Sequence, residues 1–222
     1  MEEDNVDTYG SVRAWFQQAR VEKCLDALRK NEFDAHYAPD AETAKELILS
    51  LVPPGARVAV GGSVTIREMG LPEILQERGH CVEDAWQRFE NQEEAQESAR
   101  RRLLADVFLC STNALTVDGK LINVDGSGTR VNAMIFGPRR VIVVAGVNKL
   151  VRDTEEGIWR AKNVAAPMVY RGKSAHTPCA VSGRCTSCLP PTRQCRVVTI
   201  IEARPRANTD FHVVIVGERL GY

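Results

Sequence analysis

The sequence lacks the features that mark several large classes of protein. Basic and acidic side chains balance at 29 each among 222 residues, so no positive excess points to nucleic acid or to an anionic membrane surface. The longest apolar runs, such as Val141–Val147, are far shorter than the about 20 residues of a membrane-spanning helix. The segment Met1–Asp7 is acidic rather than basic and then apolar, so we expect no signal peptide and a cytoplasmic protein.

The remaining composition is that of an ordinary folded domain. Hydrophobic residues make up 44% and charged residues 26%, which is enough apolar material for a core and excludes general disorder. At this length we expect one domain over residues 11–222, preceded by a flexible N-terminus over residues 1–10.

Short apolar segments alternate with segments of helical periodicity along the chain. We expect strands at residues 33–37, 57–60, 107–110, 140–145, 197–202 and 212–216. We expect helices at residues 11–28, 40–51, 65–78 (interrupted near Gly70), 90–104, 130–136 and 153–165. A two-residue hairpin is expected at Asp118–Gly119. This alternation predicts an α/β fold with a mostly parallel sheet flanked by helices.

Four of the seven cysteines form a compact series. Cys179, Cys185, Cys188 and Cys195 have the spacing C-x5-C-x2-C-x6-C, within an irregular excursion expected over residues 167–196. In a reducing compartment this crowding favours metal binding over disulfides, and thiolates suit iron–sulfur clusters or zinc. We favour a [4Fe–4S] cluster because all four cysteines lie in one run, and zinc is the alternative. Free thiols, or disulfides formed after isolation, are the remaining interpretation.

Glycine and small polar residues follow the predicted strands, where α/β proteins bind ligands. Gly61, Gly62 and Ser63 follow the strand predicted at residues 57–60 and predict close approach of an anion, or simply a tight turn with Ser63 as a helix cap. A second polar series predicts contacts to a small hydroxylated or phosphorylated ligand: Thr112, Asn113, Asn123, Asp125, Ser127 and Thr129. Asp118 and Asp125 are also typical turn formers; we favour that role for Asp118 and a ligand-facing role for Asn123 and Asp125.

Two charged residues complete the candidate set. Lys149 follows the strand at residues 140–145 and is either an anion partner or a solvated surface lysine. Glu68 is the best-placed carboxylate for acid–base or ester-forming chemistry, although most helical glutamates are surface residues. The sequence has no phosphate-binding P-loop, no nucleophile elbow and no G-x-G-x-x-G dinucleotide motif.

The segments VAVGGSVTIREMG, TNALTVDGKLINVDGSGTRVNAMIFGPRRVIVVAGVNK and ERLGY resemble the lactate-utilisation (LUD) domain family, the group around the lactate-utilisation protein C. The segment TPCAVSGRCTSCLPPTRQC is similar to a stand-alone branch of the family that carries this four-cysteine insertion. The resemblance implies a fold similar to ribose-5-phosphate isomerase and coenzyme A transferases, with the ligand against two glycine-rich loops. By position, the first of these loops would be Gly61, Gly62 and Ser63, and the second would comprise Asn113, Asn123, Asp125, Gly126, Gly128 and Thr129. It also implies a role in oxidising lactate to pyruvate beside iron–sulfur partner proteins.

We therefore expect a protein of lactate or organic-acid utilisation that binds a small anionic metabolite and holds a cysteine-bound cluster, with an iron–sulfur redox partner protein and without nucleic acid or membrane. One alternative is a non-catalytic binding or regulatory module with a structural metal site. Another is an isomerase- or transferase-type enzyme in which Glu68 or Asp125 is catalytic.

Overall fold

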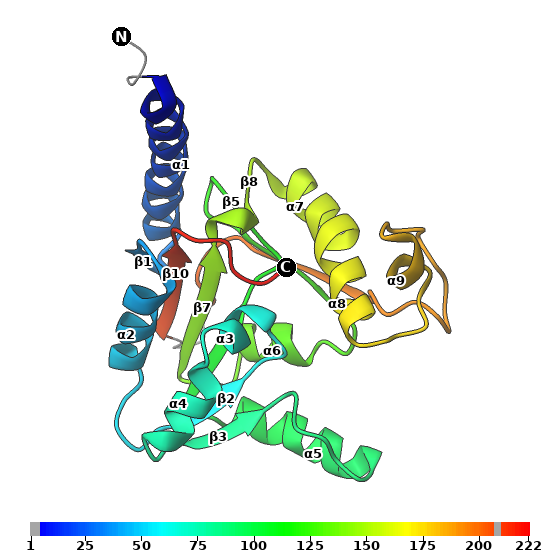
Figure 1. Cartoon of the computed structure of the whole chain (residues 1–222). Coiled ribbons are helices and arrows are strands. Elements are labelled where there is room, and N and C mark those ends of the chain that lie inside the picture. The colour runs from blue at the N-terminus through cyan, green and yellow to red at the C-terminus, as the bar shows by residue number, and fades with distance from the viewer. Residues whose placement is uncertain (1–4, 207–209) are drawn as a thin grey trace.

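A six-stranded parallel sheet forms the centre of the molecule in the computed structural model, which describes residues 5–206 and 210–222 (Figure 1). The strand order is β1-β10-β7-β4-β2-β3, and every neighbouring pair is parallel. The strands are β1 Asp34–Ala38, β2 Arg57–Val60, β3 Cys81–Asp84, β4 Val107–Ser111, β7 Arg140–Gly146 and β10 Asp210–Val216. The predicted α/β fold with a mostly parallel sheet is confirmed.

Helices cover both faces of this sheet because its strands are apolar on both sides. Residues Val141, Val143 and Ala145 of β7 face one core, and Ile142 and Val144 face the other. The first core includes α1 (Asn5–Lys30) and α6 (Thr129–Ile135). The second core includes α2 (Ala41–Leu51), α3 (Val64–Glu68) and α4 (Leu71–Glu77). Helix α5 (Gln92–Leu103) lies beside β2 and β3.

A second, four-stranded sheet in the order β8-β5-β6-β9 was not expected from the sequence. Its strands are β5 Ala114–Thr116, β6 Leu121–Asp125, β8 Leu150–Val151 and β9 Val197–Ile201. Strands β5 and β6 form the predicted hairpin, but the loop is Val117–Gly119, closed by Thr116 N–H donating to Lys120 O at 3.0 Å. Gly119 has φ 80°, the left-handed conformation that a three-residue loop requires at this place.

The region 167–196 is not irregular throughout, as we had expected. Helix α7 (Thr154–Arg160) continues through a π-helical turn at Ala161–Ala165 into α8 (Ala166–Gly172), and α9 follows at Pro178–Ser182. Pro178 lies in the first turn of α9, where a missing backbone N–H breaks no intrahelical hydrogen bond. Pro167 follows the π-helical turn directly, inside the continuous helical segment.

The N-terminal boundary also differs from the expectation. Residues 5–10, expected to be flexible, belong to α1, while residues 1–4 lie outside the described part. Within the described residues, no helix has the length and apolarity needed to cross a membrane.

Candidate functional site

A cavity of about 450 Å³ opens beside the carboxyl ends of β2, β4 and β7. Its wall combines the loops that follow these strands with residues of α8 and Tyr222. The polar and aromatic lining residues are Ser63, Thr65, Trp86, Ser111, Thr112, Asn113, Arg130, Lys149, Lys173 and Tyr222. The volume is that of a small-molecule site.

Lys149 is the most unusual of these residues. It ends the 3₁₀ helix η1 (Val147–Lys149), directly after β7, and only 3% of it is exposed. Its Nζ donates hydrogen bonds to Thr65 Oγ1 at 2.7 Å and to Ser111 Oγ at 2.8 Å. Burial, and then the positive charges of Arg160 and Arg130, lower the pKa of Lys149 to about 7. Near neutral pH the amine therefore exists in both protonation states.

Arg130, at the start of α6, is held rigidly behind the cavity. Its Nη1 donates to Ser111 O at 3.0 Å and Asn123 Oδ1 at 2.9 Å. Its Nη2 donates to Asn113 Oδ1 and Val124 O, both at 2.9 Å. Four contacts use all four Nη hydrogens of the guanidinium. Arg130 therefore adds positive charge to the site but has no spare Nη donor for a ligand.

The segment Glu218–Tyr222 brings Tyr222 to the wall of the cavity. Val147 N–H donates to Glu218 O at 3.1 Å, and Leu220 N–H donates to Asn148 Oδ1 at 3.1 Å. Gly221 N–H donates to Glu68 Oε2 at 2.6 Å. These contacts, all made by backbone atoms of the ERLGY segment, hold Tyr222 beside the cavity.

Positive charge dominates the cavity wall. Arg130, Lys149 and Lys173 line it, and none of the described lining residues is acidic. Two carboxylates lie beside this wall: Glu68 accepts a hydrogen bond from Gly221 N–H, and Asp125 Oδ2, 3.6 Å from Arg130 Nε, offsets part of the charge of Arg130. An anion is therefore the ligand that the cavity suits best.

The structure brings part of the predicted site together. Gly62, Ser63, Thr112, Asn113 and Lys149 all line the cavity. Ser63 also caps α3, because its Oγ accepts a hydrogen bond from Ile66 N–H at 3.3 Å. That these residues bind a ligand stays a prediction.

The other predicted residues lie around the cavity without lining it. Gly61 packs on β4, where its N–H donates to Leu109 O at 2.9 Å. Asn123 is fully buried and supports Arg130. Glu68 is exposed and holds Gly221.

The second glycine-rich turn faces the cysteine segment. Asp125 Oδ1 accepts hydrogen bonds from Ser127 N–H at 3.2 Å and Gly128 N–H at 3.1 Å, which is the behaviour of a turn former. Asp125 O accepts from Arg196 N–H at 2.9 Å. A Cβ on Gly126 would lie 3.0 Å from Gln194 O, so glycine permits this close approach. Gly128 and Thr129 then begin α6.

The four cysteines of the segment are all free thiols near one another. Cys179 is buried in α9, and Cys185, Cys188 and Cys195 are half-buried. Burial raises the pKa of Cys195, and the other three cysteines raise it further, while a hydrogen bond with Tyr170 lowers it. Three thiols close enough to act on Cys195, together with Cys195 itself, are a donor set that fits a soft metal or an iron–sulfur cluster.

As they lie in the structure, these sulfurs do not close a zinc site, which needs four sulfurs around one ion. No three of the four lie within 4.8 Å of one another. A tetrahedral zinc with bonds of about 2.3 Å would hold its sulfurs about 3.8 Å apart. A cluster separates its thiolates more widely, because each one binds a different iron atom.

Sequence reasoning missed several residues of this site. Arg130 and Tyr222 lie within the motifs that carry the family resemblance, so the motifs contained a signal for them. Trp86 and Lys173 reach the cavity from poorly patterned segments, and nothing in the sequence marks them.

Comparisons with known proteins agree with the fold. A family model described as the LUD domain matches residues 21–216. The crystal structure of a DUF162 family protein from Deinococcus radiodurans is similar, with a TM-score of 0.54 and 16% sequence identity. The alignment covers 90% of this chain and 98% of that one, and at this identity it shows the fold alone. No curated protein matches this chain.

Proposed function

Because this chain belongs to the LUD domain family and lines its cavity with cations, we propose that it binds a small organic or phosphorylated anion there. The observation that carries the proposal is the buried Lys149, held by two hydroxyls in a wall without acidic residues. Lactate and related 2-hydroxy or 2-oxo acids are the first candidates, in keeping with the family resemblance. We place this role in the cytoplasm.

Lys149 would recognise the anion directly. An ammonium group has three N–H donors, and Thr65 and Ser111 accept two of them. The third is available for a carboxylate or phosphate oxygen, and the charge of Arg130 supports it from behind. A bound anion favours the protonated lysine, so ligand binding raises the pKa of Lys149 from about 7.

The cysteine segment supports the second half of the proposal, a [4Fe–4S] cluster held by Cys179, Cys185, Cys188 and Cys195, with zinc as the alternative. When bound, such a cluster supplies one-electron transfer, and a separate iron–sulfur protein would exchange the electrons. Helix α8 connects the two sites: Val169 and Gly172 line the cavity, and α8 packs on α9, which carries Cys179.

The anion site is tested by calorimetric titration of the wild type with lactate, a phosphosugar and an acyl-CoA compound. We expect binding of at least one of them, weakened about ten- to a hundredfold in Lys149→Met, because a charged hydrogen bond is worth roughly 1.5–3 kcal/mol. Lys23→Met, at an exposed position of α1, is the control and keeps wild-type affinity. Equal binding by both variants would contradict the proposal.

The cluster is tested by anaerobic purification with iron, sulfide and zinc analysis. We expect brown protein with stoichiometric iron and sulfide, lost in Cys188→Ser and retained in Cys81→Ser, an exposed cysteine outside the segment. Colourless protein with one zinc per chain would instead support a structural metal site and a binding or regulatory module.

A further inference from the structure

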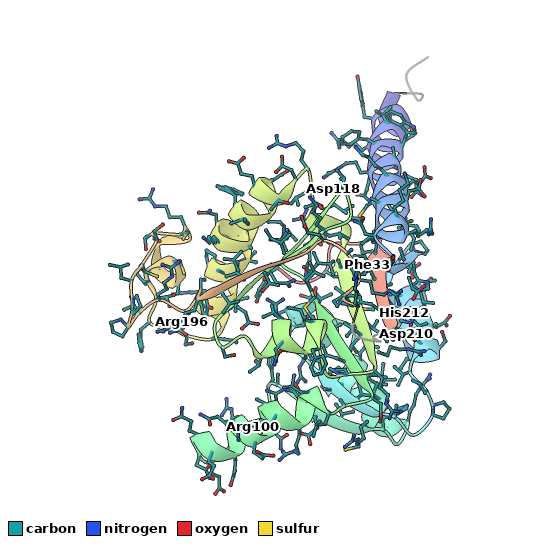
Figure 2. All side chains as sticks on the ribbon, turned by 180° about the vertical axis from the view of Figure 1, so that it is seen from behind. Phe33, Arg100, Asp118, Arg196, Asp210 and His212 are labelled. Atoms are coloured by element: carbon teal, nitrogen blue, oxygen red, sulfur yellow. The ribbon has the colours of Figure 1, made fainter. Side chains whose placement is uncertain are left out.

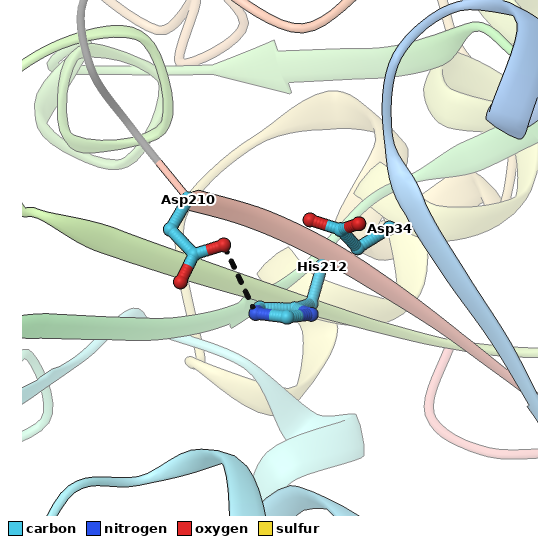
Figure 3. A group of neighbouring side chains, drawn as sticks. All are labelled: Asp34, Asp210 and His212. Atoms are coloured by element: carbon cyan, nitrogen blue, oxygen red, sulfur yellow. Dashed lines mark ion pairs between the residues drawn. The ribbon is translucent and has the colours of Figure 1, made fainter.

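A second group of potential metal ligands lies at the amino ends of β1 and β10, far from the cysteine segment. Asp34 begins β1, Asp210 begins β10, and His212 follows two residues later on β10 (Figure 3). One ligand atom from each of the three lies within 4.8 Å of the other two. Figure 2 shows Asp210 and His212 on the opposite side of the molecule from Arg196, which follows the last cysteine.

His212 supplies an observation that points to a ligand. The residue is only 8% exposed, and its Nε2 is buried without a hydrogen-bond partner among the described residues. Asp210 Oδ1 lies 3.3 Å away but does not meet hydrogen-bond geometry. A buried polar atom without a partner is costly, unless something else binds it.

The neighbouring histidine can hold His212 in the form that binds metal. His36 Nε2 lies 3.1 Å from His212 Nδ1, so one of the two nitrogens donates to the other. When His212 Nδ1 donates, its Nε2 is unprotonated, and the Nε2 lone pair is available to a metal held with Asp34 and Asp210.

The two carboxylates are also free to act as ligands. Arg140 Nε donates to Asp210 Oδ2 at 2.7 Å, and Asp210 Oδ1 therefore stays available as a metal ligand. The side chain of Asp34 accepts no hydrogen bond from any described residue and is exposed, so a metal could reach it from solvent. The cations nearest to the group are Arg140 and, beside His36, Arg29. Arg29 is paired with Asp26 at 3.4 Å, so the two carboxylates and the Arg140 guanidinium leave a net charge of −1 for a cation to balance.

We propose that Asp34, Asp210 and His212 bind a divalent metal ion of the Mn²⁺, Fe²⁺ or Zn²⁺ type, with water in the remaining positions. Such ions prefer carboxylate oxygens and imidazole as ligands, whereas softer metals prefer thiolates. Bonds of about 2.1 Å place two ligand atoms at most about 4.2 Å apart, so small side-chain rotations close the site. The ion would join edge strand β1 to β10 and stabilise that side of the sheet.

Mn²⁺ is the best probe because thiolates bind it weakly, so the cysteines do not compete for it. We would strip the full-length protein with chelator, titrate it with Mn²⁺, and follow the electron paramagnetic resonance signal of the free ion. We expect one Mn²⁺ per chain, and at least tenfold weaker binding in Asp34→Asn and in His212→Gln. Asp34→Asn is the safer variant, since that side chain forms no hydrogen bond or ion pair with a described residue.

His80→Gln is the matched control, because this histidine contacts Ala56 O elsewhere in the fold, and it should bind Mn²⁺ as the wild type does. Metal should also raise the melting temperature of the wild type and leave that of Asp34→Asn unchanged. Absence of binding, or equal affinity in Asp34→Asn and the wild type, would overturn the proposal and leave an ion pair between His212 and Asp210.

Discussion

The two ends of the central sheet carry opposite chemistry. At the carboxyl end, Lys149 follows β7 in a cavity without acidic lining residues. At the amino end, two carboxylates and His212 gather on β1 and β10, and Arg140 at the start of β7 balances only part of their charge. The same parallel strands thus present a cationic site at one end and an anionic cluster at the other.

The two ends also differ in how they are built. The cavity needs the loops after three strands and the segment ending at Tyr222, which are distant in sequence. The acidic cluster needs only two adjacent strands in register, with Asp34 paired to His212. Substitutions that disturb loops should therefore affect the cavity and spare the cluster, and the predictions below test this difference.

The largest expected effect is a gain in stability when the charge of the cavity is removed. Lys149→Met should raise the free energy of unfolding without ligand by about 1–4 kcal/mol at pH 6, because a buried charge without an ionic partner is costly. The unfolded lysine keeps a pKa near 10.5, while the folded one titrates near 7. Between these values only the unfolded state binds the proton, so wild-type stability rises with pH and the gain shrinks by pH 9.

Urea unfolding of both proteins at pH 6 and pH 9 measures this gain. If Lys149 is present for binding rather than for stability, Lys149→Met is more stable than the wild type and binds anions poorly. A destabilised Lys149→Met at both pH values would show that the amine holds Thr65 and Ser111 in place for structural reasons.

The fold was largely predictable, because its strands are short apolar runs separated by helical periodicity. Asp40 begins the helix predicted at residues 40–51, and its carboxylate accepts a hydrogen bond from Thr43 N–H at 2.8 Å. The division into two sheets was not predictable: β9 and β10 are similar apolar segments, yet β9 pairs with β6 and β10 with β7. That choice depends on packing between segments distant in sequence, which local patterns do not record.

The site was predictable only where a residue directly follows a strand. Gly62, Ser63, Thr112, Asn113 and Lys149 do so, and the parallel sheet brings them to one edge. The turn at Asp125 has the same composition but follows an antiparallel hairpin strand, which directs it toward Gln194 and Arg196. Composition alone does not distinguish these two surroundings.

The next effect tests the construction of the cavity wall. A Cβ on Gly146 would lie 2.6 Å from both Glu218 O and Leu220 N, so Gly146→Ala must displace the segment that carries Tyr222. We expect a loss of about 1–3 kcal/mol in the free energy of unfolding, together with weakened anion binding. Gly10→Ala, in α1 with no atom within 4 Å of the added Cβ, is the control and should be neutral or stabilising. Unchanged anion binding in Gly146→Ala would show that this wall is not part of the site.

The dependence of ligand affinity on pH should be a smaller effect. Anion binding requires the protonated Lys149, whose fraction falls as the pH rises through about 7. The association constant should therefore decrease toward about tenfold per pH unit at higher pH, until it reaches the affinity of the neutral amine. Calorimetric titration between pH 6 and pH 8.5 measures this slope. Lys149→Met should remove the pH dependence, and a pH-independent wild type would exclude the lysine as the titrating group.

The smallest effect is the energetic coupling between the two ends of the sheet. Strand β7 runs seven residues from Arg140 to Gly146, which separates the ends by about 20 Å at roughly 3.3 Å per residue. Substitutions at that distance without shared partners usually add within about 0.5 kcal/mol. Asp34→Asn should therefore change anion affinity less than about twofold, and Lys149→Met should leave Mn²⁺ affinity equally unchanged. A double-mutant cycle with both ligands measures the coupling; a value above about 1 kcal/mol would show that the strands transmit binding from one end to the other, and the two sites would then act as a single unit.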